Sequence, residues 1–202
     1  DGRTDSEELE LKLIEVRTMA GDSIEFELEL EREILRESFE VVDTVVIPAD
    51  EYRGIDFELE FSSSSNRPLF GELEIAYGDF YHGSSIRTEL DLSWRPSKYF
   101  QLDSEAGMTL VDLPGEEFEV LTSSVGLRIT PTTRFSFNSI TQFDNQSKTI
   151  GINNRVRYIL KPGCDLFLVL NKGLERRELK EHRRFRTFKN EAVAKLGWTF
   201  QF

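Results

Sequence analysis

Hydrophobic and polar residues alternate one by one along most of this chain. The pattern is clearest over residues 192–202, where Ala, Ala, Leu, Trp, Phe and Phe occupy the even positions and mostly polar residues the odd ones. Successive side chains of a β-strand point to opposite faces, so this period predicts strands with one apolar and one polar face. No segment keeps a helical period. The chain is therefore predicted to be all-β.

About eleven such segments follow one another, several of them longer than an average strand. Their apolar faces run over Leu9–Leu13, Ile24–Leu30, Ile55–Phe61, Leu69–Tyr77, Ile86–Trp94, Phe100–Met108, Leu121–Ile129, Phe135–Phe143, Ile150–Tyr158, Leu166–Leu170 and Ala192–Phe202.

The connections between these segments are expected to alternate in length. Short turns rich in proline, glycine or serine are expected at Ala20–Asp22, Ser62–Pro68, Arg95–Lys98, Thr130–Thr132 and Lys161–Gly163. Longer charged connections are expected at Arg36–Tyr52, Asp79–Ser84, Asp112–Glu117, Asp144–Lys148 and Lys172–Asn190. Outer-membrane barrels show this asymmetry, with short periplasmic turns and longer extracellular loops.

Alternation alone does not decide which face meets solvent. In a soluble barrel the apolar face forms the interior, and in a membrane barrel it faces lipid. Aromatic residues near the predicted strand ends, such as Tyr77, Trp94, Tyr158 and Trp198, favour lipid, because such rings sit well at headgroup level. The predicted fold is an antiparallel up-and-down transmembrane β-barrel, in which residues 1–202 form a single barrel segment.

The odd strand count adds a further expectation. Bacterial single-chain barrels have an even number of strands, with both termini on the periplasmic side. Eleven strands ending there would start on the extracellular side. The segment is therefore expected to be the carboxy-terminal part of a larger barrel whose amino-terminal strands are absent from this chain.

Composition narrows the partners and the chemistry. A net charge of -12 makes nucleic acid an unfavourable partner. The single Cys164 and the two histidines give no metal-type spacing, and no cofactor motif is present. His82 near Asp79 and Ser84 lacks the orienting arrangement of a hydrolase triad. No enzymatic activity and no catalytic residue are therefore expected.

On the membrane interpretation, the polar positions line the lumen, and they change sign along the chain. The candidate lining residues are Glu25, Glu27, Glu29, Glu58, Glu60, Glu72, Glu74, Glu89, Asp91, Arg128, Arg155 and Arg157. Acidic linings favour cations. The plainer alternative is a charged lining that only keeps the interior wet and cross-braced.

Two further sets of residues are candidates for interactions outside the lumen. The basic loop residues Arg176, Arg177, Arg183 and Arg184 suit lipopolysaccharide phosphates, although such a run is more often simply solvated. The end of the chain is similar to the assembly signal of outer-membrane barrels, carried by Gly197, Trp198, Phe200 and Phe202.

An ordered series of short segments resembles one bacterial family. The segments are Val46-Ile47-Pro48, Glu51-Tyr52-Arg53, Gly78-Asp79-Phe80-Tyr81, Trp94-Arg95-Pro96-Ser97, Val111-Asp112-Leu113-Pro114, Gln142-Phe143-Asp144-Asn145, Lys161-Pro162-Gly163 and Asp165-Leu166-Phe167-Leu168-Val169. From about Gly21 to Phe202 they resemble the carboxy-terminal barrel, a domain of unknown function, of proteins whose larger members carry an amino-terminal family 9 carbohydrate-binding domain. The resemblance implies an outer-membrane location and places sugar binding in the absent domain, so no sugar-binding residue is assigned here.

The functional expectation is a bacterial outer-membrane barrel for the passage or uptake of small hydrophilic solutes, with saccharides as one candidate class. Its expected partners are outer-membrane lipid, lipopolysaccharide and the barrel assembly machinery. One alternative is a membrane anchor for the absent carbohydrate-binding domain. The other is a soluble β-barrel with an apolar interior.

Overall fold

A computed structural model describes residues 5–42, 45–179 and 182–199, with the side chains of residues 177–184 outside the description. The described residues form strands β1 (Ser6–Arg17), β2 (Ser23–Ile34), β3 (Phe39–Val42), β4 (Val45–Ile47), β5 (Glu51–Ser62), β6 (Leu69–Phe80), β7 (Gly83–Ser97), β8 (Phe100–Leu113), β9 (Glu116–Thr132), β10 (Phe135–Asp144), β11 (Thr149–Lys161), β12 (Cys164–Leu179) and β13 (His182–Trp198). None of them lies in a helix capable of crossing a membrane.

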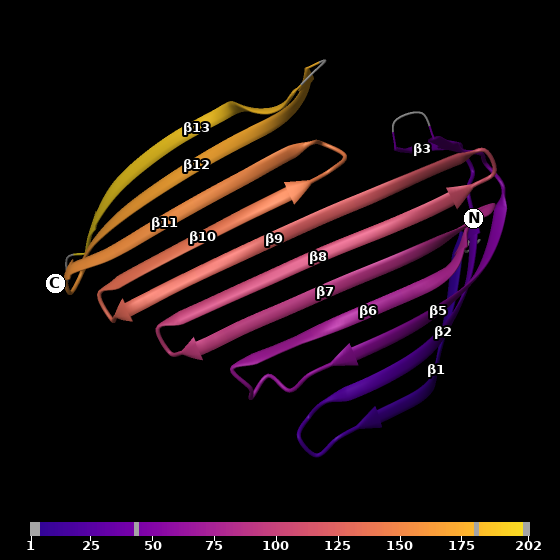
Figure 1. The fold of residues 1–202 in the computed structure, drawn as a ribbon, viewed down its shortest axis with the longest axis horizontal. Coiled ribbons are helices and arrows are strands. Elements are labelled where there is room, and N and C mark those ends of the chain that lie inside the picture. Colours follow the sequence, from indigo (N-terminus) through magenta and orange to yellow (C-terminus); the bar gives the residue numbers. More distant parts are fainter. Residues whose placement is uncertain (1–4, 43–44, 180–181, 200–202) are drawn as a thin grey trace. The chain divides into compact units, whose positions relative to one another are not determined.

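Eleven of the strands form a single antiparallel up-and-down sheet (Figure 1), in the order β1-β2-β5-β6-β7-β8-β9-β10-β11-β12-β13. The remaining two, β3 and β4, pair with each other in a small hairpin. The prediction of an all-β meander of about eleven long strands is confirmed. Among the described residues β1 and β13 are the two edges of the sheet and the sheet is not closed, so the predicted barrel is shown only as far as this open sheet.

The chain divides into two compact units. The first contains residues 1–65, 71–90 and 107–121, and so holds β1 to β5, nearly all of β6 and one end of each of β7, β8 and β9. The second contains residues 66–70, 91–106 and 122–202, and so holds β10 to β13 and the other ends of β7, β8 and β9.

Strand register in the middle of the first unit separates an apolar from a polar face. On one face Phe26 lies opposite Leu59, and Leu28 opposite Phe57. On the other face Glu27 lies opposite Glu58. Strand β1 keeps this separation through a bulge at Leu13, because Lys12 pairs with Glu27 and the next pair joins Ile14 to Phe26. The two faces are called the apolar face and the polar face below.

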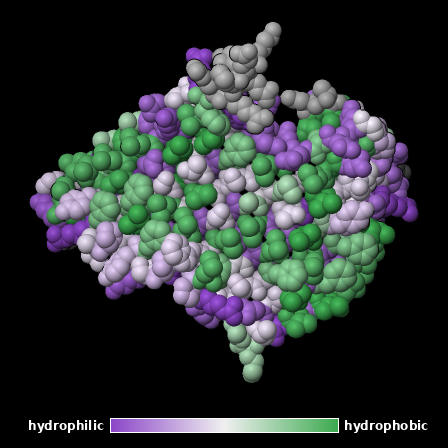
Figure 2. Space-filling view, viewed as in Figure 1, coloured by the Kyte–Doolittle hydropathy of each residue, from purple (hydrophilic) through white to green (hydrophobic). Residues whose placement is uncertain are grey.

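Exposure is inverted relative to an ordinary soluble sheet. On β5 the apolar side chains Ile55 and Phe57 are exposed, 45% and 46%, while the neighbouring carboxylates Asp56 and Glu58 are only partly exposed. On β6 Tyr77 is 56% exposed, whereas Ala76 on the polar face is buried. Hydrophobic side chains cover much of the sheet face in view in Figure 2.

The connections agree only in part with the sequence prediction. Turns at Ala20–Asp22, Ser62–Pro68 and Lys161–Gly163 are confirmed. The two turns expected at Arg95–Lys98 and Thr130–Thr132 instead lie at residues 98–99 and 133–134, because Pro96 and Pro131 are accommodated within the ends of β7 and β9. The strand ends joined by these short turns are called the turn ends, and the opposite ends the loop ends.

The expected long connections at the loop ends are mostly wrong. Residues 81–82 and 114–115 are two-residue turns, and residues 145–148 form a four-residue turn. Residues expected to form the Lys172–Asn190 loop continue the β12–β13 ladder, where Glu175 pairs with Arg186 and Leu179 with His182. The charged residues of this segment predict a loop, but their backbone continues the ladder of β12 and β13. The expected alternation of short and long connections therefore does not hold.

The predicted long connection between β2 and β5 is present, but it contains two short strands. Strands β3 and β4 of this connection pair with each other, and the side chains of Val45 and Ile47 are buried against Val111 and Leu113 of β8. Ile47 is 1% exposed and is the largest fully buried side chain among the described residues. The compact core therefore lies under this hairpin and not between the long strands.

Gly78 of β6 lies against the backbone of β5, opposite Asp56. A Cβ atom at Gly78 would stand 1.9 Å from Asp56 Oδ1 and 2.5 Å from the Ile55 carbonyl oxygen, whereas one at Gly151 would meet nothing within 4 Å. We expect Gly78→Ala to lower the free energy of unfolding by about 2 kcal/mol, because the backbone of β5 must shift.

The matched control is Gly151→Ala, which should leave stability unchanged or raise it slightly. The measurement is the midpoint of urea unfolding followed by circular dichroism. Equal midpoints for the two variants would contradict the close approach of β5 and β6 at this point.

Candidate functional site: the polar face of the sheet

Carboxylates run across neighbouring strands on the polar face of the first unit. Glu10 pairs with Glu29, which in turn lies opposite Asp56. Glu25 lies opposite Glu60, and Glu60 opposite Glu74. Like charges placed directly opposite one another destabilise a sheet. An acidic face of this density therefore needs cations or water close by.

The cations on this face come from β1 and β7. The Lys12 ammonium contacts the Glu25 carboxylate and lies 3.2 Å from Glu27 Oε1. Arg17 Nη2 lies 3.6 Å from Glu25 Oε1. From the other side, Arg87 Nε lies 3.9 Å from Glu74 Oε1. The acidic rows are thus flanked by cations, and Arg87 is a member of this site that the sequence interpretation missed.

The polar face of the second unit carries a row of arginines and amides. Asn138 lies opposite Arg128 on one side and Arg155 on the other. Arg128 Nε donates a 3.3 Å hydrogen bond to Asn138 Oδ1. Arg157 Nη2 contacts Asp165 Oδ2 at 3.1 Å. The acidic residues of the earlier strands thus share the polar face of the first unit, and the arginines of the later strands share the polar face of the second.

The predicted lining residues share this polar face, strand by strand. Glu25, Glu27, Glu29, Glu58, Glu60 and Glu74 are brought together by direct pairing in the first unit, and Glu72 lies opposite Ser62 beside them. Glu89 and Asp91 lie between Arg87 and Ser93 on the polar face of β7 and are exposed. That any of them lines a lumen stays a prediction.

A small cavity of about 180 Å³ opens on the polar face near the loop ends. Glu31 and Asp56 line it together with Arg53, Arg87, Tyr52 and Tyr81. Tyr81 sits in the two-residue turn after β6, with its ring centroid 4.8 Å from that of Tyr52. The aromatic residues of this cavity were not predicted, although Tyr52 occupies a polar-face position and could have been noticed for that reason.

Burial raises the pKa of Tyr81 to about 12, and the neighbouring Glu33 carboxylate, which accepts a hydrogen bond from the phenol, adds to the shift. Glu51, at the loop end of β5, has the opposite shift. Hydrogen bonds from Arg32 and Arg53 lower the pKa of Glu51 to about 2. Arg32 Nε lies 2.9 Å from Glu51 Oε1, and Arg53 Nη2 lies at the same distance. This charged cluster borders the apolar face.

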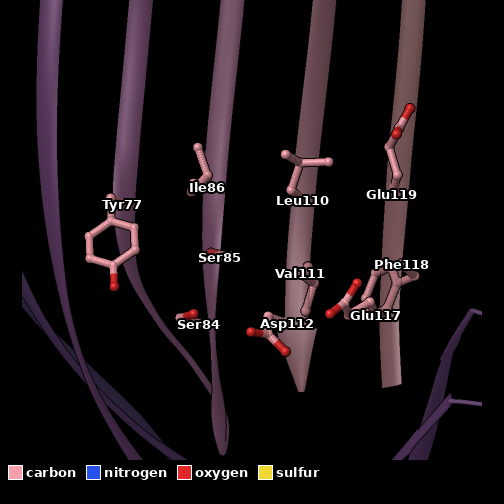
Figure 3. Close-up of a pocket in the computed structure, with 10 residues that line it drawn as sticks. All are labelled: Tyr77, Ser84, Ser85, Ile86, Leu110, Val111, Asp112, Glu117, Phe118 and Glu119. Atoms are coloured by element: carbon pink, nitrogen blue, oxygen red, sulfur yellow. The ribbon is translucent and has the colours of Figure 1, made fainter. Parts of the chain in front are cut away.

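The apolar face has a similar border on β6 to β9. Figure 3 shows Ser84, Asp112 and Glu117 near the ends of their strands, and Tyr77, Ile86 and Leu110 further along. These residues line a shallow pocket of about 470 Å³. Along these strands the apolar face therefore changes from hydrophobic side chains to carboxylates within two to four residues.

The predicted phosphate-binding arginines do not form a loop. Arg176 is half-buried in β12, while Arg177 pairs with Arg184, and Arg183 pairs with Glu178 along the hairpin. The side chains of Arg177, Arg183 and Arg184 lie outside the described residues. Of the predicted assembly signal, Gly197 pairs with Asp165, and Trp198, 52% exposed, receives the Lys161 ammonium at 4.2 Å from its ring centroid. Phe200 and Phe202 also lie outside the described residues.

In the part of the chain that the structure describes, no group of three His, Cys, Asp or Glu side chains has the arrangement of a metal site. His82 packs against Tyr52, with ring centroids 5.3 Å apart. The chemistry that the polar face offers is therefore electrostatic: charged groups of both signs held in fixed rows.

Comparison with protein-family models, curated proteins and solved structures gives no match to this chain. The resemblance to the barrel associated with family 9 carbohydrate-binding domains stays a prediction.

The high pKa of Tyr81 leads to a pH prediction. A folded pKa above the unfolded value of about 10 favours the folded state below pH 10, and this contribution is lost as pH rises towards 12. Absorbance at 295 nm should show one phenol ionising near pH 12, and that component should be missing in Tyr81→Phe. Replacing Glu33 with glutamine should move it towards pH 10. If the phenol ionisation that is lost in Tyr81→Phe occurred near pH 10 in the parent protein, the burial of Tyr81 would be contradicted.

Proposed function

We propose that this chain is part of a β-barrel of the bacterial outer membrane. Its apolar face contacts acyl chains, and its polar face borders a water-filled interior through which small hydrophilic solutes pass. The observation that carries the proposal is the inverted exposure on β5 and β6: Ile55, Phe57 and Tyr77 are exposed, whereas the neighbouring polar-face residues are more sheltered. In water an apolar surface of this extent favours association, whereas lipid accommodates it.

The height of the charge-free band supports lipid contact. On β8 the apolar face is free of charge from Phe100 to Leu110, and on β9 from Leu121 to Pro131. Each stretch is about 11 residues, or about 35 Å along the strand, which a tilt near 45° reduces to about 25 Å. This matches the hydrocarbon thickness that such barrels span.

Aromatic side chains at the borders of the band add to this support. Trp94, Tyr158 and Trp198 are 44%, 40% and 52% exposed near the turn ends, and Tyr77 is exposed near a loop end. Amphipathic rings are favoured at the level of lipid headgroups. The charged cluster of Arg32, Glu51 and Arg53 lies beyond the band, where water and headgroups are available.

The proposed barrel has to pair both edges of the sheet. Among the described residues the edge strands are β1 and β13, and the sheet between them is not closed. Unpaired backbone edges are too costly in lipid to persist. In the proposed barrel both edges are therefore paired.

An anchoring role is the second candidate. It is favoured by one observation, the packing of the β3–β4 hairpin on apolar residues at the loop ends. A barrel obstructed in this way holds a domain at the membrane without conducting solutes. Saccharides remain one candidate solute class for the conducting barrel.

The membrane orientation is tested at two neighbouring residues of β7. Leu92 lies on the apolar face and is 41% exposed, and Ser93 lies on the polar face, where its hydroxyl hydrogen-bonds Asp103. Nitroxide labels are attached to Leu92→Cys and Ser93→Cys, with Cys164 replaced by serine, in the full chain reconstituted in phospholipid vesicles. We expect the label at residue 92 to be relaxed mainly by oxygen, and the label at residue 93 mainly by a water-soluble nickel chelate.

The reverse accessibility, or equal chelate accessibility at both residues, would sink the membrane proposal. A monodisperse monomer in buffer without detergent would favour the soluble barrel instead.

Passage is tested through Arg87. Removing this cation from an acidic lining should raise the preference for cations, and planar bilayers measure this as a reversal potential in a salt gradient. We expect Arg87→Gln to increase the cation-to-anion permeability ratio about twofold. The control is Arg36→Gln, because Arg36 is 63% exposed, pairs with Asp5 and is not among the residues that line the acidic cavity. Silent bilayers for every variant would favour the anchor.

A further inference from the structure

The polar face changes character at the loop ends of four strands. Counting along the alternation, polar-face positions are held by Tyr52 of β5, Phe80 of β6, Val111 and Leu113 of β8, and Phe118 of β9. Val111 and Leu113 are 3% and 6% exposed, and the three aromatic residues pack around them. The polar face, which is strongly acidic further along β5 and β6, thus ends in an apolar patch, which is called the seat below.

The β3–β4 hairpin occupies the seat. Val45 and Ile47 point into it and are buried, while Val46 between them is 56% exposed. Val41 and Val42 of β3 add to the contact, and the Phe39 ring lies 5.8 Å from that of Tyr81. The hairpin pairs with no strand of the large sheet, so side-chain packing holds it in place.

Polar contacts join the two ends of the connection that carries the hairpin, and these ends are called its neck below. Leu35 N–H donates to the Asp50 carbonyl oxygen at 2.9 Å, and the Tyr52 hydroxyl donates to the Pro48 carbonyl oxygen at 2.9 Å. These bonds join the two ends of the connection to each other and to β5. The hairpin is therefore a small compact unit, tethered at its neck and held on the seat by apolar burial.

We propose that the β3–β4 hairpin is a cap that covers the loop end of the polar face and restricts access to the acidic rows beneath it by size. This inference rests on the proposed function for its role in solute passage, but the cap itself can be tested without a membrane. Lifting the cap leaves the sheet intact, because no ladder bond of the large sheet is broken, and it uncovers Tyr52 and Phe80, which also line the acidic cavity of Glu31, Asp56 and Arg87.

The test is size-dependent labelling of a cysteine at Ser85, a residue of the same cavity, with Cys164 replaced by serine. The full chain, folded in detergent micelles, is treated with a 5-kDa polyethylene glycol maleimide and, separately, with a small methanethiosulfonate. In the Val45→Ala/Ile47→Ala variant we expect the bulky reagent to react about tenfold faster, because truncation weakens the packing that holds the cap. The small reagent should react at nearly the parent rate.

The matched control is Val46→Ala, which removes the same two methyl groups as Val45→Ala, but from the exposed side of β4, and should leave both rates unchanged. Truncating the seat with Val111→Ala should reproduce the effect of the hairpin variant in smaller measure, and it guards against misfolding of the hairpin itself. Unchanged bulky-reagent rates in both truncated variants, or an equal increase in Val46→Ala, would overturn the cap. Failure of the membrane or conductance experiments with size-dependent labelling intact would overturn only the passage role.

Discussion

The separation of two faces by strand register is the constraint on which the rest of the structure depends. With a side-chain period of two, a slip of one residue in any pair exchanges the faces of a whole strand. The pairing of Glu27 with Glu58, beside that of Phe26 with Leu59, shows how closely repulsive and favourable contacts are placed. Burial of the apolar residues, or their contact with lipid, has to outweigh the repulsion among the carboxylates.

The acidic rows can be accommodated because the structure places cations on the same side. Lys12, Arg17 and Arg87 contact carboxylates at the margins of the rows, and each side chain keeps a sizeable exposed fraction. Exposed pairs contribute little stability individually. Their effect is to lower the local potential of a face that carries much of the chain's negative charge, which would otherwise oppose compact folding.

Much of the sheet could be predicted from the sequence, since alternation is a local property. The eleven strands and the sharing of one face by Glu25, Glu58 and Glu74 follow from period two and the chain order. The ends of the strands could not be predicted in the same way. Pro96 and Pro131 indicate turns, yet each lies inside a strand end, and the charged residues around Arg177 and Arg184 extend a ladder. The hairpin cap depends on contacts between Ile47 and residues some sixty positions away, and no local pattern specifies them. The apolar residues at polar-face positions, Val111 and Leu113, were the one available signal.

The bulge at Leu13 has a consequence for chain length. Because Lys12 pairs with Glu27 and Ile14 with Phe26, residue 13 occupies no position in the ladder. A chain lacking this residue would keep every pair of β1 with β2 and become a regular strand. A deletion at Glu27 would instead shift half of β2 by one position and place its glutamates among phenylalanines. Insertions and deletions in this hairpin should therefore accumulate at one point of the edge strand and be excluded from its neighbour.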